Sequence, residues 1–265
     1  MIRRETDDGL FLITHGEHAR LAWRIACEWG NAQFPIPEPR HDILSAVLTH
    51  DDGWLLRDSR PMLNQHGEPE AFTRSLVGAY SAFENIDLPA YLRVRAEATE
   101  AVAARNPFAA IIVSMHTVNL LTERADLSTI PEKYRALHAG FVEAQRAFQR
   151  DTAAQLHASP TALERAFRFL QTCDQLSLVA CVAYQEPCTL RHRIETTTRE
   201  STEIHCRPRN KSTCEITPWP FQQEPVALSF EARRFSTFQF NSDQAYRTAF
   251  DIAPRETLQV TFVSE

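Results

Sequence analysis

The chain has 265 residues, a length that permits one large domain or one domain with an appendage. Hydrophobic residues make up 43% of it, which is enough to form a real core. Its formal charge of -6 and its sequence pI of about 5.9 argue against a protein that holds nucleic acid through a strongly basic surface.

Further features of the composition narrow the class of protein. Lysine occurs only at Lys133 and Lys211, so an anion site would depend on arginine forks or on a metal ion. The seven glycines form no GxGxxG or P-loop motif, which excludes a glycine-rich phosphate cradle. No signal peptide and no apolar segment of membrane-spanning length is visible, so we expect a cytoplasmic protein without a membrane partner. The six cysteines form no CxxC pair. Those on helical, apolar stretches are expected to be small buried thiols, and Cys206 and Cys214 could form a disulfide across a hairpin.

Local signals predict the elements up to about residue 185. Alternating apolar residues around an Asp-Asp-Gly turn predict a hairpin, and apolar residues at helical spacing behind polar caps predict helices. Proline-rich or aperiodic stretches predict loops. The predicted segments are a hairpin over 2–13, a helix from 15 to about 30, a loop over 34–39, a helix that carries His50 and Asp51 and ends near 57, a loop over 58–72, and helices over 74–85, 89–105, 107–121, 132–156 and from 160 onward.

The pattern changes after about residue 185. The remaining chain alternates between apolar and polar residues and is rich in Thr, Phe, Val and Pro, which favours short antiparallel strands. The predicted segments are strands over 203–206, 226–230, 235–240 and 258–263, with one short helix over 243–250.

Metal-competent side chains recur on the apolar faces of the predicted helices. His50 lies three and four positions after apolar residues, so it shares the face that they bury. A buried carboxylate, such as that of the adjacent Asp51, is costly unless it is paired or binds a metal ion. His18, His116 and Asp174 occupy comparable positions on three further helices. Imidazole and carboxylate together suit a divalent first-row ion, namely Mn, Fe, Ni, Co or Zn.

The order of these residues, a histidine, a His-Asp pair and a later aspartate, resembles the HD-domain superfamily of metal-dependent phosphohydrolases. The flanking motifs look like an uncharacterised bacterial family, the DUF3891 proteins, over nearly the whole chain. The motifs that carry this resemblance are Ile13-Thr14-His15-Gly16-Glu17-His18-Ala19, His50-Asp51-Asp52-Gly53-Trp54, Val113-Ser114-Met115-His116, Asp174-Gln175-Leu176-Ser177-Leu178 and Pro218-Trp219-Pro220-Phe221.

The resemblance implies a fold and a division into domains. We expect a mainly α protein, an HD-domain-like helical bundle with a small β-rich C-terminal appendage. The helical metal-binding domain would cover residues 1–185, with the N-terminal hairpin included, and the appendage would cover residues 186–265.

The resemblance also implies a metal site with one ion per chain rather than two, whose ligands are His18, His50, Asp51 and Asp174. Asp51 would in addition orient the attacking water, and His116, a second catalytic residue, would donate to the phosphate or bind a second metal ion. The candidates for contacts around the ion or with the substrate are His15, Arg20 and Trp54. The expected activity is hydrolysis of a small phosphorylated molecule, for instance a nucleotide, and no nucleic-acid polymer is expected as a partner.

Two other functions stay open. HD-type di-iron oxygenases use extra histidines between the His-Asp pair and the last aspartate, and His116 and His138 could fill those places. The context of His138 is weakly apolar, which predicts a surface residue. A non-catalytic HD-like scaffold with a structural metal is the third possibility. Asp52 is expected to be a solvated loop carboxylate.

Overall fold

The computed structural model describes residues 1–73, 83 and 87–265 of the chain. About 48% of the residues are helical and 21% lie in strands, and the strands include a curled seven-stranded sheet. The fold is therefore mixed α/β, and the prediction of a mainly α bundle with a small β appendage is wrong. The physical reason is that the N-terminal hairpin and the C-terminal strands, which are far apart in sequence, join one sheet.

The chain divides into two compact units that are interleaved in sequence. Unit 1 comprises Met1–Ile36, Trp54–Val77 and Thr172–Glu265, and unit 2 comprises Pro37–Gly53 and Gly78–Gln171. The long helix α7 (Pro160–Cys181) contributes its first part to unit 2 and its second part to unit 1. The predicted division into a domain over residues 1–185 and an appendage over residues 186–265 stays a prediction.

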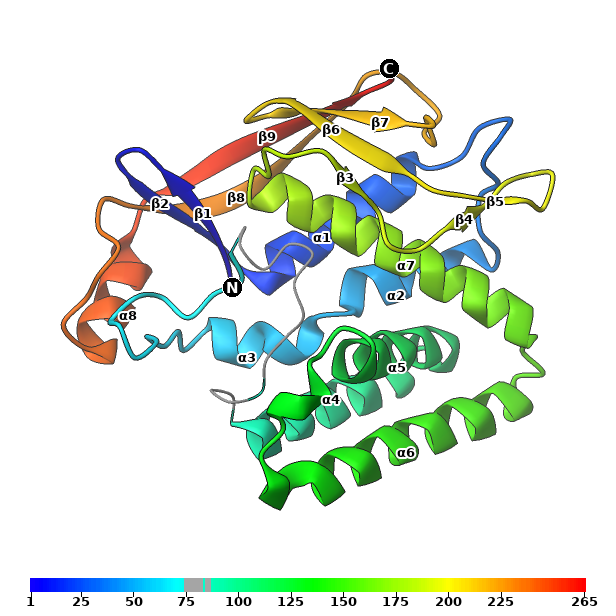
Figure 1. Ribbon diagram of the computed structural model, residues 1–265, viewed down its shortest axis with the longest axis horizontal. Coiled ribbons are helices and arrows are strands. Elements are labelled where there is room, and N and C mark those ends of the chain that lie inside the picture. The colour runs from blue at the N-terminus through cyan, green and yellow to red at the C-terminus, as the bar shows by residue number, and fades with distance from the viewer. Residues whose placement is uncertain (74–82, 84–86) are drawn as a thin grey trace. The chain divides into compact units, whose positions relative to one another are not determined.

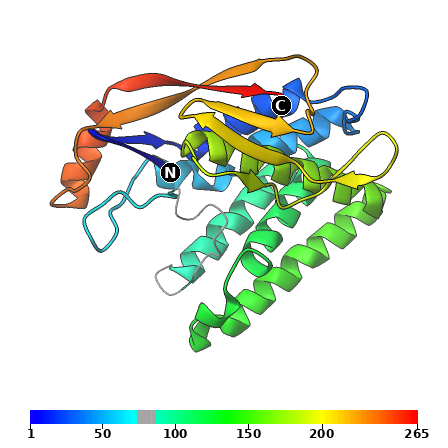
Figure 2. The same ribbon diagram turned by 45° about the horizontal axis from the view of Figure 1, so that its top comes forward.

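The sheet of unit 1 has the strand order β1-β2-β8-β9-β7-β6-β3 (Figure 1). Neighbouring strands run antiparallel except for β7 and β9, which are parallel. The two longest strands, β8 and β9, lie side by side in Figure 2. The strands of this sheet are β1 (Ile2–Thr6), β2 (Gly9–Ile13), β3 (Cys188–Thr189), β6 (His205–Asn210), β7 (Thr213–Thr217), β8 (Val226–Phe235) and β9 (Arg255–Val263), and a separate pair is formed by β4 (Ile194–Glu195) and β5 (Ser201–Thr202).

The predicted N-terminal hairpin is present and is central to unit 1. Gly9 has φ +146°, and an added Cβ would collide with the carbonyl oxygen of Phe235, so both the turn and the contact with β8 require glycine. All five residues of β2 are buried, and β2 pairs with β1 on one side and with β8 on the other. A prediction from local pattern could find this hairpin but not its third strand.

Helices complete the core of unit 1. Thr14 caps α1 (His15–Glu28) by accepting a hydrogen bond from the backbone N–H of Glu17, as predicted, and α1 packs against β8. The helix α8 (Asp243–Ile252) also matches its prediction, and its Tyr246 and Phe250 join an apolar cluster with residues of β2 and β8. Unit 1 further contains the short helix α3 (Leu55–Asp58).

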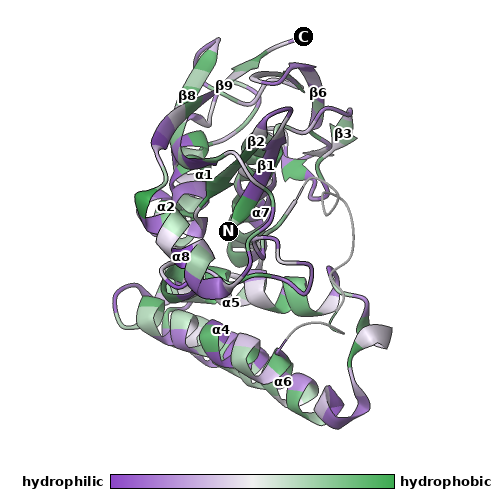
Figure 3. Cartoon of the chain, turned by 90° about the vertical axis from the view of Figure 1, so that its left-hand side faces the viewer, coloured by the Kyte–Doolittle hydropathy of each residue, from purple (hydrophilic) through white to green (hydrophobic). Residues whose placement is uncertain are grey.

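Unit 2 is helical in the part that the structure describes. Its central helix is α5 (Pro107–Thr122), which has buried residues on every side and packs against α2 (Arg40–Thr49), α4 (Leu88–Ala103) and α6 (Glu132–Gln155). Hydrophilic and hydrophobic residues alternate around α4 and α6 in Figure 3, as expected for helices with one buried face. Two short 3-10 turns, η1 (Asp52–Trp54) and η3 (Leu127–Thr129), complete the described elements. Among the described helices, none combines the length and the hydrophobicity needed to cross a bilayer.

Three predicted elements differ from the structure or lie mostly outside its described residues. The helix that carries His50 was expected to reach Arg57, but α2 ends at Thr49 with His50 as its C-cap. The chain continues from there into η1, in which Gly53 approaches α4 so closely that an added Cβ would lie 2.9 Å from the Cβ of Ala98. The strand predicted over 235–240 is wrong, because β8 ends at Phe235 and residues 236–240 form bends and coil. The helix predicted over 74–85 falls almost entirely outside the described residues.

Candidate metal centre

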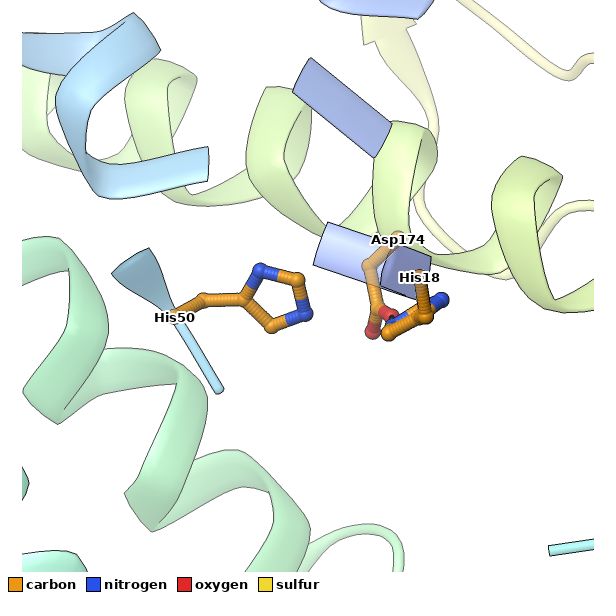
Figure 4. Close-up of side chains that lie close together, drawn as sticks. All are labelled: His18, His50 and Asp174. Carbon is orange, nitrogen blue, oxygen red and sulfur yellow. Dashed lines mark ion pairs between the residues drawn. The ribbon is translucent and has the colours of Figure 1, made fainter. Parts of the chain in front are cut away.

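In unit 1, His18 of α1 and Asp174 of α7 face each other (Figure 4). His18 Nε2 lies 2.9 Å from Asp174 Oδ1, and the side chain of His18 is 1% exposed. The cap at Thr14 begins α1, and the backbone N–H of His18 donates to the Thr14 carbonyl in the first turn. The helical period then places His18 on the face that carries the buried Leu21 and Ala22.

A serine determines which nitrogen of His18 carries the proton. The hydroxyl of Ser177 donates to the backbone carbonyl of Asp174 at 2.8 Å, so its oxygen accepts from Nδ1 of His18, also at 2.8 Å. In the neutral imidazole, Nε2 therefore carries the lone pair and points at a carboxylate oxygen. Two acceptor atoms at 2.9 Å repel each other unless a proton or a metal ion lies between them.

The spacing of these two atoms suits a metal ion. Two ligand atoms that lie about 2.1 Å from one first-row ion and about 90° apart are about 3.0 Å from each other. The 2.9 Å between Nε2 of His18 and Oδ1 of Asp174 is close to this value. His18 is buried and the Asp174 side chain is only 14% exposed, so little water screens the two groups from each other.

In unit 2, a second group comprises His50, Asp51 and His116. All three are buried, and each offers one ligand atom within 4.8 Å of the other two. The imidazoles of His50 and His116 meet edge to face, with ring centroids 5.2 Å apart. His50 Nε2 lies 3.8 Å from Asp51 Oδ2. Buried imidazole and carboxylate in this arrangement could hold a first-row metal ion.

Both histidines of this group have the same tautomer as His18. His50 Nδ1 lies 2.7 Å from the carbonyl oxygen of Val47, which can only accept, so Nδ1 carries the proton. His116 Nδ1 contacts the side-chain oxygen of Gln171, whose amide nitrogen donates to Asn119 at 2.9 Å. Fixing Nδ1–H in this way leaves Nε2 as the coordinating nitrogen, which is how histidine ligands are usually oriented.

Arg95 is a member of this group that the sequence analysis missed. Its Nη1 donates to Asp51 Oδ1 at 3.1 Å, and only 4% of its side chain is exposed. Burial alone would lower the pKa of Arg95, but the neighbouring Tyr91 and Asp51 raise that pKa above its ordinary value, so the guanidinium stays charged. A signal was available, because Arg95 lies seven positions after Leu88 and three after Leu92 on the buried face of α4.

The three residues predicted to lie around the ion or the substrate form other contacts. His15 stacks on Trp54, with ring centroids 4.9 Å apart, and its Nδ1 lies 2.9 Å from Asp58 Oδ1. Arg20 is half exposed and forms an ion pair with Glu17 one turn away. Burial of Asp58 would raise its pKa, but the hydrogen bonds and charge of His15 outweigh this and hold the pKa below its ordinary value.

Two expectations about neighbouring residues are corrected or refined. His138 was expected at the surface but is buried, because its Nε2 donates to the backbone carbonyl of Leu121 at 2.9 Å and its ring meets Phe83 edge to face. It belongs to neither the His18 pair nor the His50 group. Asp52 is partly exposed and pairs with Arg105 at 3.4 Å, and its partial burial raises its pKa.

Comparison with known proteins identifies the chain at the level of a family. The family described as "Protein of unknown function (DUF3891)" matches residues 1–237. The chain belongs to the DUF3891 family. The match includes every residue of the two groups described above and ends shortly after β8, before α8 and β9. No curated protein and no solved structure matches the chain.

Proposed function

We propose that this DUF3891 protein is a metal-dependent phosphohydrolase that acts on a small phosphorylated molecule, such as a nucleotide. One divalent first-row ion would be held by His18, His50, Asp51 and Asp174. The observation that carries the proposal is the common tautomer of His18, His50 and His116, since each donates from Nδ1 to a fixed acceptor and keeps its Nε2 lone pair for coordination.

The sharing of one ion by all four residues rests on the resemblance to the HD-domain superfamily. The structure contributes two parts, each within its own unit: the His18–Asp174 pair in unit 1 and the His50, Asp51 and His116 group in unit 2. Both parts consist of imidazole and carboxylate groups that are buried or, for Asp174, 14% exposed, a donor set that suits Mn, Fe, Ni, Co or Zn.

The chemistry follows from these donors. A bound ion of this class lowers the pKa of a coordinated water and neutralises phosphoryl oxygens. Asp51, whose Oδ1 is held by Arg95, can orient that water through its other oxygen. The Nδ1 proton of His116 is held in a hydrogen bond to the side-chain oxygen of Gln171. His116 would therefore exchange protons through Nε2, by accepting one from the water or donating one to the leaving group.

Elemental analysis of protein purified without chelator tests the metal site. Wild type should hold about one first-row ion per chain, and the His50→Ala and Asp174→Ala variants should lose it, because removing one ligand weakens the whole site. His138→Ala is the matched control, since it removes another buried histidine of unit 2 and should keep the ion. An Asp174→Ala variant that keeps the full metal content would limit the site to the group of unit 2.

Activity is tested separately with the metal-loaded protein. Release of inorganic phosphate is measured from a panel of nucleotides and sugar phosphates, with the His116→Gln variant beside the wild type. We expect metal-dependent phosphate release that the variant loses. Metal without phosphate release would favour the non-catalytic scaffold, and two irons per chain with oxygen-dependent turnover would favour the di-iron oxygenase.

A further inference from the structure

Three cysteines gather on one face of the sheet in unit 1. Cys188 on β3 is directly opposite Cys206 on β6, and Cys206 is directly opposite Ile216 on β7. Cys214 lies two residues before Ile216, so it is the diagonal neighbour of Cys206 on the same face. Cys206 therefore has Cys188 directly beside it on one neighbouring strand and Cys214 diagonally beside it on the other.

The three thiols differ in accessibility. β3 is the edge strand of the sheet, and Cys188 on it is half-buried, whereas Cys206 and Cys214 are buried. An oxidant can therefore reach Cys188 first, with Cys206 directly behind it. All six cysteines of the chain lie in its described part, and each is a thiol.

The backbone spacing permits a bond between the first two thiols. Directly opposed residues of an antiparallel pair have Cα atoms about 4.5–5.5 Å apart. Disulfides join residues whose Cα atoms are about 4.4–6.8 Å apart. The Cys188–Cys206 pair therefore needs no shift in strand register to form a disulfide.

The electrostatics of the pair favour an attacking and a resolving thiol. The neighbouring Cys206 thiol lowers the pKa of the Cys188 thiol, although burial opposes this effect. The neighbouring Cys188 and Cys214 thiols, together with burial, raise the pKa of Cys206. Cys188 is thus the more readily deprotonated of the two, and the thiolate is the form that reacts with oxidants.

We propose that Cys188 and Cys206 form a peroxide-reactive pair, in which Cys188 is oxidised and Cys206 closes a disulfide. The Cys188 thiolate attacks hydrogen peroxide and breaks its O–O bond, which gives a sulfenic acid and, after proton transfer, one water. The Cys206 sulfur then displaces the sulfenic hydroxyl, which leaves as a second water with the Cys206 proton. Two thiols and one peroxide yield one disulfide and two waters. This site is independent of the proposed hydrolase function.

Disulfide mapping on the folded protein tests the proposal. The protein is treated with hydrogen peroxide, its remaining thiols are blocked with N-ethylmaleimide, and it is digested with trypsin and chymotrypsin. Cleavage after Tyr184 separates Cys188 from Cys173 and Cys181, and cleavage after Arg209 and Lys211 separates Cys206 from Cys214. We expect a peptide pair joined through Cys188 and Cys206, which reduction with dithiothreitol releases.

Three variants assign the roles. Cys188→Ser should abolish the cross-link, and Cys206→Ser should leave Cys188 as a sulfenic acid that dimedone labels more strongly than in wild type. Cys27→Ser is the matched control, because it removes another half-buried cysteine, on α1, and should keep the cross-link. The proposal is overturned if wild-type Cys188 stays a thiol under peroxide that oxidises free glutathione, or if the only disulfide joins Cys206 to Cys214.

Discussion

Asp51 accepts a hydrogen bond from Arg95, at 3.1 Å between Oδ1 and Nη1, and both side chains are buried in unit 2. The ion pair binds one carboxylate oxygen, and the other oxygen, Oδ2, lies 3.8 Å from Nε2 of His50. A buried carboxylate would otherwise be costly, so Arg95 stabilises the charged form of the residue that we propose as ligand and water-orienting group.

Breaking the Arg95–Asp51 pair should destabilise the fold more than removing both charges. Arg95→Gln and Asp51→Asn each leave a buried charge without its partner, so each should cost about 3–5 kcal/mol in the free energy of unfolding. The double variant should cost less than the sum of the two. Urea unfolding with a chelator present measures the cycle without a contribution from bound metal. Additive effects would contradict a direct coupling between the two side chains.

The histidine tautomers can be observed directly. In metal-free protein at about pH 8.5, ¹⁵N-edited NMR should show the proton of His50 and of His116 on Nδ1. His138 supplies an internal contrast, because it donates from Nε2 to Leu121 and should show the opposite tautomer. Single His→Gln variants assign the signals. An Nε2–H tautomer at His50 or His116 would remove the main support for coordination through Nε2.

Ser177 should raise the metal affinity, although we propose it as a partner of His18 and not as a ligand of the ion. Ser177→Ala removes the acceptor for Nδ1–H of His18, and losing such a partner lowers metal affinity by roughly 10–100-fold while the stoichiometry stays the same. Ser114→Ala is the matched control, since it removes a buried hydroxyl whose bonds go to Gln145 and Gln149. Calorimetric titration with Zn²⁺ or Mn²⁺ measures both. Equal affinity in wild type and Ser177→Ala would mean that the serine does not orient the ligand.

Asp58 should contribute stability that depends on pH. Its pKa is lower in the folded state than in the unfolded state, so its contribution is complete above the unfolded value of about 3.9 and is lost as the pH falls through the lower folded value. Asp58→Asn should cost about 1–3 kcal/mol near neutral pH, and the difference from wild type should shrink below about pH 4. Urea unfolding between pH 3 and pH 7 tests this. Asp7→Asn, at an aspartate that is 98% exposed, should stay close to wild type throughout.

The local elements could be predicted because their causes are local. Thr14 caps α1, Asn106 and Pro107 open α5, and the turn around Gly9 forms the hairpin, all within a few residues of the elements that they begin. The sheet could not be predicted, because the pairing of β2 with β8 and the parallel pairing of β7 with β9 leave no signature within either strand. The error in fold class follows from these long-range pairings.

In the candidate site as well, some residues could be identified from local sequence patterns and others only from the folded structure. Helical spacing on apolar faces pointed to the four residues that we propose as metal ligands and to His116, all of which are buried or nearly so. Arg95 could not be assigned as the partner of Asp51 from sequence, because the two residues lie 44 positions apart in different segments of the chain and meet only in the folded structure. Ser177 and Gln171 orient histidines across long sequence separations, and contacts of that kind require the folded structure.

The pairing of β2 with β8 can form only late in synthesis, because β8 is made long after β2. Leu10 is opposite Phe235, so 225 positions (235 minus 10) separate the partners. At about 5–20 residues per second, a ribosome needs roughly 11–45 seconds to deliver β8 after β2 has been made. During that interval the apolar residues of β2 have no second neighbour and are available to other nascent chains. We therefore expect that chaperone supply and translation speed, rather than the stability of the finished fold, limit the yield of this protein in a cell.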